Sequence, residues 1–250
     1  MSFVEIAGAS YAYRVGQARE IVVDRVEWTI GQGEFHCLVG RSGCGKTTLL
    51  KVAAGLLAPS QGSVYIEGNE VLEPSAQVGF VFQSPTLLEW ATVLDNVLLP
   101  ISLKRRLLPS DRQGALDLLA LVGLADYAGR YPRELSGGQQ SRVAIARALI
   151  VEPLVLLMDE PFAALDAITR QELQDDLLRL CALRRTTVLF VTHDIAEAVY
   201  LADRVAVMKQ GRFTHALTID LAKPREHDVR YSVRFNQLCL EIHQTMDAPG

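Results

Sequence analysis

The segment Gly40-Arg41-Ser42-Gly43-Cys44-Gly45-Lys46-Thr47 has the residue types and the spacing that bind the phosphates of a nucleoside triphosphate. An apolar run of strand length, residues 35–39, precedes it, and residues 48–54, which contain no Gly or Pro, are rich in helix formers. In such an arrangement the loop turns its backbone N–H groups toward phosphate oxygens, and the positive end of the helix dipole points to the same place. Lys46 then reaches the outer phosphates and the Thr47 hydroxyl binds Mg²⁺. The alternative, an ordinary glycine-rich turn, leaves the flanking strand and helix unexplained.

Polar side chains follow three further apolar runs of strand length. Gln83, the pair Asp159-Glu160 and His193 come directly after these runs, and open α/β sheets bind ligands outside the carboxyl ends of their strands. Taken alone, a Gln or a His is more often a capping or surface residue, and a carboxylate pair can be a solvated strand end. In a chain that also contains a phosphate loop, the carboxylates favour Mg²⁺ chemistry. The three runs are residues 78–82, 154–158 and 187–192.

A second glycine-containing motif, Leu135-Ser136-Gly137-Gly138-Gln139, opens a predicted helix. Ser136 and Gln139 have the spacing of a capping box, and the apolar residues that follow fall on one helix face. Two glycines beside a helix cap are costly unless another group must approach the backbone closely. An anion would benefit from such an approach, because the N-terminus of a helix attracts negative charge.

Composition limits the class of protein. The 250 residues carry a formal net charge of −4, and 49% of them are hydrophobic, as in a folded globular protein. This charge gives no support to a nucleic-acid partner, which usually requires a basic face. No run approaches the roughly 18 apolar residues of a spanning helix and no signal peptide is evident, so we expect the chain to stay in the cytoplasm. The four cysteines lack metal-ligand spacing and are expected to be reduced thiols.

The N-terminal residues 1–34 are expected to form short strands, at 3–6 and 26–30, separated by a polar break. Tyr11 and Tyr13 lie in that break. An aromatic ring at either position can stack on a nucleotide base or cover the edge of a sheet, and both alternatives stay open.

A mostly helical insertion is expected from Thr86 to about Arg133, where the strand pattern stops. Thr218 to Gly250 should form one helix and a loose end. Three prolines are expected to interrupt the helices of the insertion: Pro100, Pro109 and Pro132.

With the phosphate loop and residues 135–139 both present, the chain resembles the nucleotide-binding subunit of an ABC transporter, from about Val4 to Gly211. The resemblance implies an α/β fold, namely a P-loop NTPase (ABC ATPase) core with an N-terminal antiparallel β subdomain and a helical insertion. The expected boundaries are a single ABC ATPase domain at 1–250, an inserted helical subdomain at 84–134 and a short C-terminal extension at 218–250.

Further segments match other parts of the family's pattern. Phe82-Gln83 resembles the Q-loop, Leu154 to Asp159 the Walker B strand, Ala164-Leu165-Asp166 the D-loop and His193 the H-loop. Ala164 stands where the D-loop often has Gly or Ser. A narrower resemblance, to the importer group for nitrate, taurine, alkanesulfonates and related small solutes, rests on residues 87–97, residues 160–166 and Cys44.

The family implies two copies arranged head to tail, with ATP and Mg²⁺ between them. Glu160 is expected to be the general base or water-polarising carboxylate, with Gln83, His193 and Lys46 as further catalytic residues. The expected Mg²⁺ ligands are Thr47, Gln83 and Asp159.

The nucleotide is expected to contact both copies, with Ser136 and Gly138 of the second copy closing on the γ-phosphate. Tyr13 best matches the adenine-stacking position, with Tyr11 as the alternative. The full set of expected nucleotide-binding residues is Tyr13, Gly40, Ser42, Gly43, Cys44, Gly45, Lys46, Thr47, Thr48, Ser136, Gly137, Gly138, Gln139 and Asp166.

The resemblance also predicts partners and location. These are a homodimer of ATPase subunits, two transmembrane permease subunits and, indirectly, an extracytoplasmic solute-binding protein, at the cytoplasmic face of the cell (inner) membrane. The permease contact is expected around residues 84–108, where Trp90 either faces the partner or packs inside the insertion. The alternatives are a soluble ABC ATPase that is not coupled to transport and the ATPase of an exporter.

Overall fold

The computed structural model describes residues 2–16, 18–163 and 165–248, which form two compact units. The first unit contains residues 1–75 and 187–250, and the second contains residues 76–186. The chain thus leaves the first unit after residue 75 and returns to it at residue 187. Ala164 of the predicted D-loop lies outside the described ranges.

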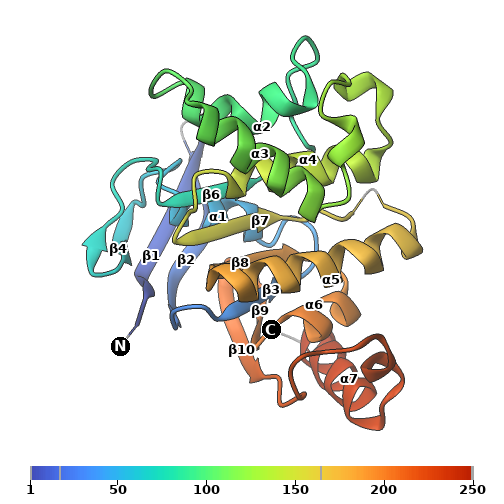
Figure 1. Cartoon of the computed structure of the whole chain (residues 1–250). Helices are drawn as coiled ribbons and strands as arrows, with labels where there is room; N and C mark the ends of the chain where they lie inside the picture. The colour runs from blue at the N-terminus through green and yellow to red at the C-terminus, as the bar shows by residue number, and fades with distance from the viewer. Residues whose placement is uncertain (1, 17, 164, 249–250) are drawn as a thin grey trace. The chain divides into compact units, whose positions relative to one another are not determined.

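The first unit begins with an antiparallel sheet, which is blue and cyan in Figure 1. Its central strand β1 pairs with β2 on one side and with β4 on the other, and alternate residues near the end of β2 are buried. This sheet confirms the predicted N-terminal antiparallel β subdomain. In the order β2-β1-β4-β5, the strands are Ala18–Ile30, Val4–Val15, Gln61–Ile66 and Asn69–Glu70.

Tyr11 and Tyr13 lie inside β1, so the predicted polar break between two short strands is wrong. Tyr11 pairs with Val23 and Tyr13 pairs with Glu20, within one long hairpin. Register shifts along β1, one of them next to the left-handed Gly8 (φ 60°), interrupt the alternation of apolar and polar residues. The sequence pattern depends on this alternation, and therefore it missed most of the hairpin.

A second sheet in the first unit contains the strand that leads into the phosphate loop. Here β3 (Phe35–Val39) lies between β8 (Thr187–Thr192) and β9 (Arg204–Lys209) and is parallel to both. β10 (Arg212–Thr218) pairs antiparallel with β9. Every residue of β3 and β8 is buried, as expected for parallel strands that are covered on both faces.

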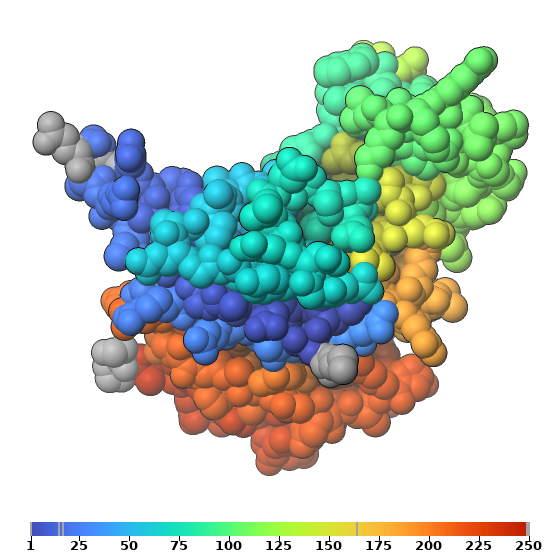
Figure 2. Space-filling model, turned by 90° about the vertical axis from the view of Figure 1, so that its left-hand side faces the viewer, coloured from blue at the N-terminus to red at the C-terminus, as the bar shows by residue number. Residues whose placement is uncertain are grey.

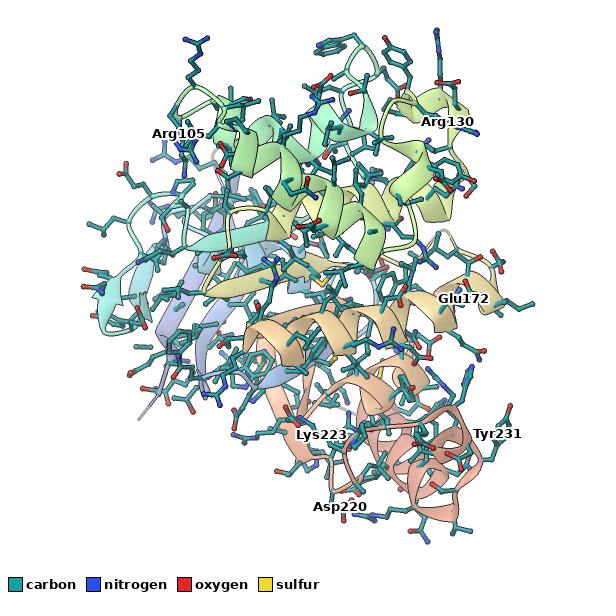
Figure 3. The ribbon with its side chains drawn as sticks, in the orientation of Figure 1. Arg105, Arg130, Glu172, Asp220, Lys223 and Tyr231 are labelled. Atoms are coloured by element: carbon teal, nitrogen blue, oxygen red, sulfur yellow. The ribbon has the colours of Figure 1, made fainter. Side chains whose placement is uncertain are left out.

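The described residues of the first unit also form the α-helices α1 (Lys46–Ala53), α6 (Ile195–Leu201) and α7 (Val233–Asp247). α1 packs on β8 and on the first hairpin, and α6 packs on β3. α7, which packs on α6, is the helix expected in the C-terminal segment; a 3₁₀ turn, η3 (His227–Tyr231), precedes it. Figure 3 labels Tyr231 at the end of this turn, where its side chain is exposed.

The second unit contains two parallel strands, β6 (Val78–Val81) and β7 (Val155–Asp159). In the described part of this unit, helix α4 (Gly137–Leu149) packs against β6 and against α2 (Val93–Ser102), α3 (Pro109–Leu121) and α5 (Ala167–Arg184). In Figure 2 the segment that contains α2 and α3 forms a compact green lobe. No described helix of either unit is long and apolar enough to span a membrane. The described residues of the second unit also form the 3₁₀ helices η1 (Ala125–Tyr127) and η2 (Pro132–Glu134).

The region from 86 to 133 is helical as predicted, with two corrections. Pro109 and Pro132 begin α3 and η2, but Pro100 lies inside α2, so the break predicted there is wrong. Pro100 is close to the end of α2, where the loss of its N–H affects only the last turn. Trp90 is 77% exposed, so the alternative that it packs inside the insertion is also wrong.

Candidate functional site

The phosphate loop connects β3 to α1 within the first unit. Val39, the last residue of β3, pairs with Thr192, the last residue of the parallel strand β8. Gly40 and His193 therefore leave neighbouring strands at the same edge of the sheet. His193 is exposed there, next to the loop that is predicted to bind phosphates.

Close backbone contacts explain two glycines of the loop. Gly45, the N-cap of α1, has φ 108°, and a Cβ atom there would lie 2.3 Å from the carbonyl oxygen of Val22. A Cβ atom at Gly40 would lie 2.4 Å from the carbonyl oxygen of Met208. Larger residues at either position would push the loop away from β2 or β9, so the loop shape depends on both glycines.

Lys46 points into the phosphate loop. Its side chain is 5% exposed, and Nζ donates hydrogen bonds to the carbonyl oxygens of Gly40 (2.8 Å) and Arg41 (3.1 Å). The loop therefore encloses a positive charge that has only neutral carbonyl acceptors among these bonds. An anion brought to the loop would neutralise this charge in a place of low dielectric, where the gain is largest. Thr47, the next residue, is exposed at the start of α1.

The outer side of the phosphate loop faces the end of α7. Arg41 Nη2 lies 3.1 Å from Asp247 Oδ1. A cavity of about 460 Å³ is lined by residues 40–44, 208–210 and 246–248. Cys44 lines this cavity and is half-buried. Burial raises the pKa of its thiol, although the nearby Lys46 acts in the opposite direction.

Tyr13 lies close to the start of α1. Its hydroxyl is 3.4 Å from Thr48 Oγ1, and its ring meets the ring of Tyr11 edge to face at a centroid distance of 5.0 Å. Tyr13 is 39% exposed, whereas Tyr11 is half-buried. Of the two tyrosines, Tyr13 thus has the more exposed ring, and the ring of Tyr11 packs against it.

In the second unit, the predicted catalytic groups follow β6 and β7. Val81 of β6 pairs in parallel with Met158 of β7, so Gln83 and the Asp159-Glu160 pair leave the same edge of this strand pair. Asp159 is 6% exposed, Glu160 is half-buried and Gln83 is exposed. Glu160 also has φ 44°, a left-handed backbone that is uncommon for a non-glycine residue.

The predicted capping box at the start of α4 is confirmed. Ser136 Oγ accepts a hydrogen bond from the Gln139 N–H (3.3 Å), and Gln139 Oε1 accepts one from the Ser136 N–H (2.9 Å). The two glycines between them differ. A Cβ atom at Gly138 would lie 2.6 Å from Cγ2 of Thr169 on α5, whereas at Gly137 no atom lies within 4 Å. Helix packing therefore gives one reason for Gly138, but it gives none for Gly137.

Asp166, the D-loop carboxylate, caps α5. Its Oδ1 accepts hydrogen bonds from the N–H groups of Ile168 (3.1 Å) and Thr169 (3.0 Å). The pKa of Asp166 is lowered mainly by a hydrogen bond from the Thr169 side chain and, next in size, by one from the Thr169 backbone. The residue thus has a structural role in addition to the nucleotide contact predicted from the sequence.

One residue beside the candidate site was missed in the sequence. Arg147, on α4, donates hydrogen bonds to the backbone carbonyls of Pro85 and Thr86, just after Gln83. In the sequence, the signal that could have marked it is a charged residue between two alanines, Ala146 and Ala148, on a predicted helix. The structure shows that both alanines are buried.

The structure groups the predicted site residues by unit. In the first unit it brings together Tyr13, the phosphate loop, Thr48 and His193, and in the second it brings together Gln83, Asp159 and Glu160 at one strand edge. Residues 136–139, which we call the signature residues, lie at the start of α4, the signature helix, and Asp166 caps the start of α5, which packs on α4. Among the described residues no group of three or more His, Cys, Asp or Glu side chains is placed to hold a metal ion. The predicted Mg²⁺ ligands are instead one hydroxyl, one carboxylate and one amide, which are the oxygen donors that Mg²⁺ prefers.

Comparison with known proteins identifies the family. The family model described as "ABC transporter" matches residues 23–163. The chain is 42% identical to the bicarbonate transport ATP-binding protein CmpD of Synechocystis sp., over 91% of this chain and 82% of that protein. It is 45% identical to the aliphatic sulfonates import ATP-binding protein SsuB of Bacillus licheniformis, over 94% of this chain and 92% of that protein. The second match falls in the importer group predicted from the sequence.

A solved structure agrees with the sequence matches. The ATP-binding cassette MJ0796, solved as a dimer in a post-hydrolysis state bound to ADP and Pi, aligns with a TM-score of 0.79 and 33% identity. The alignment covers 88% of this chain and 100% of that one. The phosphate loop, the capped α4 helix and these matches together show that the chain belongs to the ABC transporter family and is an ATP-binding ATPase of that family.

Proposed function

We propose that this chain is the ATP-hydrolysing subunit of a binding-protein-dependent ABC importer, in which ATP-driven closure of a head-to-tail dimer powers uptake of a small solute. The observation that carries the proposal is the exposed start of α4. Ser136 and Gly137 are exposed, and the space beside Gly137 is open although the capping box is complete. A helix N-terminus that is left open in this way suits the phosphates of a nucleotide held by a second copy.

Each candidate residue then has one role in binding or hydrolysing ATP. Lys46 and the loop amides hold the phosphates, Tyr13 stacks on adenine, and His193 contacts the γ-phosphate. Glu160 polarises the attacking water, and Gln83 senses the water and the metal. Because phosphoryl transfer depends mainly on positioning and charge stabilisation, a site completed by a second copy is active only when the dimer is closed.

Mg²⁺ would be held by Thr47, Gln83 and Asp159, with Asp159 acting through water. The ion would neutralise charge on the phosphates when it is bound. Thr47 is exposed at the start of α1, whereas Asp159 is nearly buried at the end of β7. A hydroxyl and a carboxylate are both oxygen donors that suit this ion.

Residues 84–108 are proposed as the permease contact. Around α2 this segment exposes large apolar side chains that would be covered in an assembly, among them Trp90 (77%), Leu103 (78%) and Leu108 (53%). An ATPase docked in this way is peripheral, at the cytoplasmic face of the membrane. The extracytoplasmic binding protein would act on it only through the permease.

The transported molecule is proposed to be a small solute of the nitrate, sulfonate or taurine kind. The support is the names of the relatives, since CmpD is a bicarbonate transport protein and SsuB an aliphatic sulfonates import protein. Solute selection itself belongs to the permease and the binding protein, so residues of this chain do not distinguish these solutes.

The proposed dimer can be tested with Glu160→Gln on a sizing column. With saturating ATP and Mg²⁺ the variant should elute as a dimer and hydrolyse ATP at least 100-fold more slowly than the wild type, since the water is no longer polarised. Glu152→Gln is a matched control, because Glu152 precedes β7 and has a similar left-handed backbone (φ 50°). A Glu160→Gln monomer at saturating ATP would contradict the composite site.

Coupling to transport needs a second experiment. The tagged chain is isolated from gently solubilised membranes of its host, and its partners are identified by mass spectrometry. Recovery of a polytopic membrane protein encoded beside a solute-binding protein supports the importer. Recovery of a membrane protein without such a neighbour supports an exporter, and recovery of soluble partners alone supports an ATPase that is not coupled to transport.

A further inference from the structure

Arg147 lies on α4, the signature helix, and hydrogen-bonds to residues that follow Gln83. We call residues 83–86 the Q-loop segment. Arg147 Nη1 donates a hydrogen bond to the Thr86 carbonyl oxygen (2.9 Å). Its Nη2 donates to the Pro85 carbonyl oxygen (2.8 Å) and to Thr86 Oγ1 (3.2 Å). One guanidinium group therefore holds two consecutive backbone carbonyls that lie two and three residues after Gln83.

The geometry of this contact is specific to arginine. The planar fork of the guanidinium presents parallel N–H groups, whereas a lysine ammonium is a point donor that cannot span both carbonyls in the same way. Burial partly desolvates the guanidinium, and this lowers the pKa of Arg147. A desolvated charge is stable only where its donors are satisfied, so the contact with residues 85 and 86 is an essential part of the environment of Arg147.

Thr86 adds a second constraint. Its backbone is left-handed, with φ 47°, which is costly for a β-branched residue. Such a conformation persists only where the surrounding structure enforces it. The hydrogen bonds from Arg147 to both the carbonyl and the hydroxyl of Thr86 supply this enforcement.

Helix α4 connects this contact with the signature residues. Ser136 caps the helix at one end, and Arg147 lies about 16 Å along the axis from it at a rise of about 1.5 Å per residue. Between them, Arg142 donates to the Val122 carbonyl oxygen (2.9 Å) and pairs with Asp176 (2.8 Å) and Glu172 (3.2 Å) on α5; Glu172 is labelled in Figure 3. The helix is thus fixed along its length, and Arg147 transmits its position to the Q-loop segment.

We propose that Arg147 is a positioning residue that makes the Q-loop segment and the signature helix move as one body. When the dimer closes and Ser136 meets the nucleotide, this movement also fixes the position of Gln83. The inference rests on the proposed function, in which Gln83 and Ser136 act on ATP. Arg147 itself touches neither the phosphate loop nor Tyr13 among its hydrogen bonds. Its loss should therefore impair hydrolysis and leave ATP binding largely intact.

The test compares Arg147→Lys with Arg184→Lys. Arg184 is a matched control, since its Nη1 also donates to a backbone carbonyl of α4, that of Leu149 (3.1 Å). Within the described ranges the other polar contact of this side chain is with Glu152, and neither contact involves residues 83–86. Arg147→Lys should lower kcat for ATP at least tenfold with KM within threefold of the wild type. Arg184→Lys should change neither value by more than twofold.

Hydrogen exchange supplies a second readout on the same proteins. Backbone amides of residues 84–92 should exchange at least tenfold faster in Arg147→Lys than in the wild type, with no such change in Arg184→Lys. A kcat within twofold of the wild type, an equal loss in both variants, or a loss that appears mainly in KM would overturn the proposal.

Thr86→Gly tests the same contact from the loop side if Arg147→Lys fails to fold. It removes the hydroxyl acceptor and lets the backbone relax, so it should lower kcat about two- to fivefold with KM unchanged. Wild-type kcat in a folded Thr86→Gly protein would overturn the proposal. A failure of the proposed function looks different, because Glu160→Gln would then remain a monomer at saturating ATP, whatever the kcat of Arg147→Lys.

Discussion

Alanine at Gly138 should destabilise the protein, whereas alanine at Gly137, the preceding residue, should not. The two glycines are neighbours in the first turn of α4, but of the two it is Gly138 that faces α5. A methyl group at Gly138 would lie 2.6 Å from Thr169 Cγ2. Rotation of Thr169 away from it is hindered, because the Thr169 side chain hydrogen-bonds the Asp166 carboxylate.

The size of the effect follows from two opposing contributions. Overpacking of a fitted contact costs about 1–3 kcal/mol, and replacement of a helical glycine by alanine returns up to about 1 kcal/mol. With about 1 kcal/mol returned, Gly138→Ala should lose up to about 2 kcal/mol, or up to roughly 8 °C in Tm for a chain of this size, and it should be about 1–3 kcal/mol less stable than Gly137→Ala. Gly137→Ala has no opposing clash, so its Tm should be equal to or slightly above that of the wild type.

Urea and thermal unfolding measure these changes, and Thr169→Ser provides the control. The serine keeps the hydroxyl that bonds Asp166 but lacks the methyl group that clashes. The double variant Gly138→Ala, Thr169→Ser should thus recover most of the lost stability, with a coupling energy of about 1 kcal/mol. If Gly138→Ala is as stable as Gly137→Ala, or if Thr169→Ser recovers nothing, the packing explanation is refuted.

Three further predictions concern the first unit. Tyr13→Ala should raise the Kd for ATP about 2- to 12-fold, as expected for about 0.5–1.5 kcal/mol of stacking; Tyr13→Phe should leave it unchanged, and equal losses in both variants would refute ring stacking. Maleimide labelling of Cys44 should block ATP binding and should accelerate above pH 9, because burial raises the pKa of this thiol; full ATPase activity of protein shown by mass spectrometry to be labelled at Cys44 would contradict its placement. The free energy of unfolding should fall as the pH drops below about 6.5, by at most about 1.4 kcal/mol per pH unit, because burial lowers the pKa of His36 and the unfolded chain binds the proton first. His36→Gln should flatten this slope in urea unfolding between pH 5 and 7.5, and an unchanged slope would assign it to other groups.

Local chemistry made several elements predictable from the sequence. The capping box consists of Ser136 and Gln139, which are three residues apart in the sequence, and both of its hydrogen bonds are present. The strand bounds 187–192 follow from a short apolar run that is buried on both faces. In each case the residues that decide the structure are close together in the chain.

Features set by distant contacts were missed or misassigned. The long β1–β2 hairpin depends on pairing across register shifts, which hide the strand period. Gly138 was attributed to an approaching anion alone, because its contact with Thr169 crosses between two helices. Arg147 was not singled out, since its acceptors are backbone carbonyls some 60 residues earlier in the chain. Carbonyl groups occur in every residue, so no sequence pattern marks them as partners.

Backbone strain gives the candidate site a property that side-chain motifs alone do not show. Thr86 and Glu160 have positive φ values of 47° and 44°, and they follow β6 and β7, the two strands whose ends hold Gln83 and Asp159. A left-handed conformation costs a non-glycine residue about 1–2 kcal/mol, which a glycine at either position would avoid. Glycine would also make the backbone at these positions more flexible, and nearby side chains such as Gln83 and Asp159 would then be held less firmly in one direction. Phosphoryl transfer gains most from fixed directions, so the strain at Thr86 and Glu160 is consistent with a site in which position matters more than local stability.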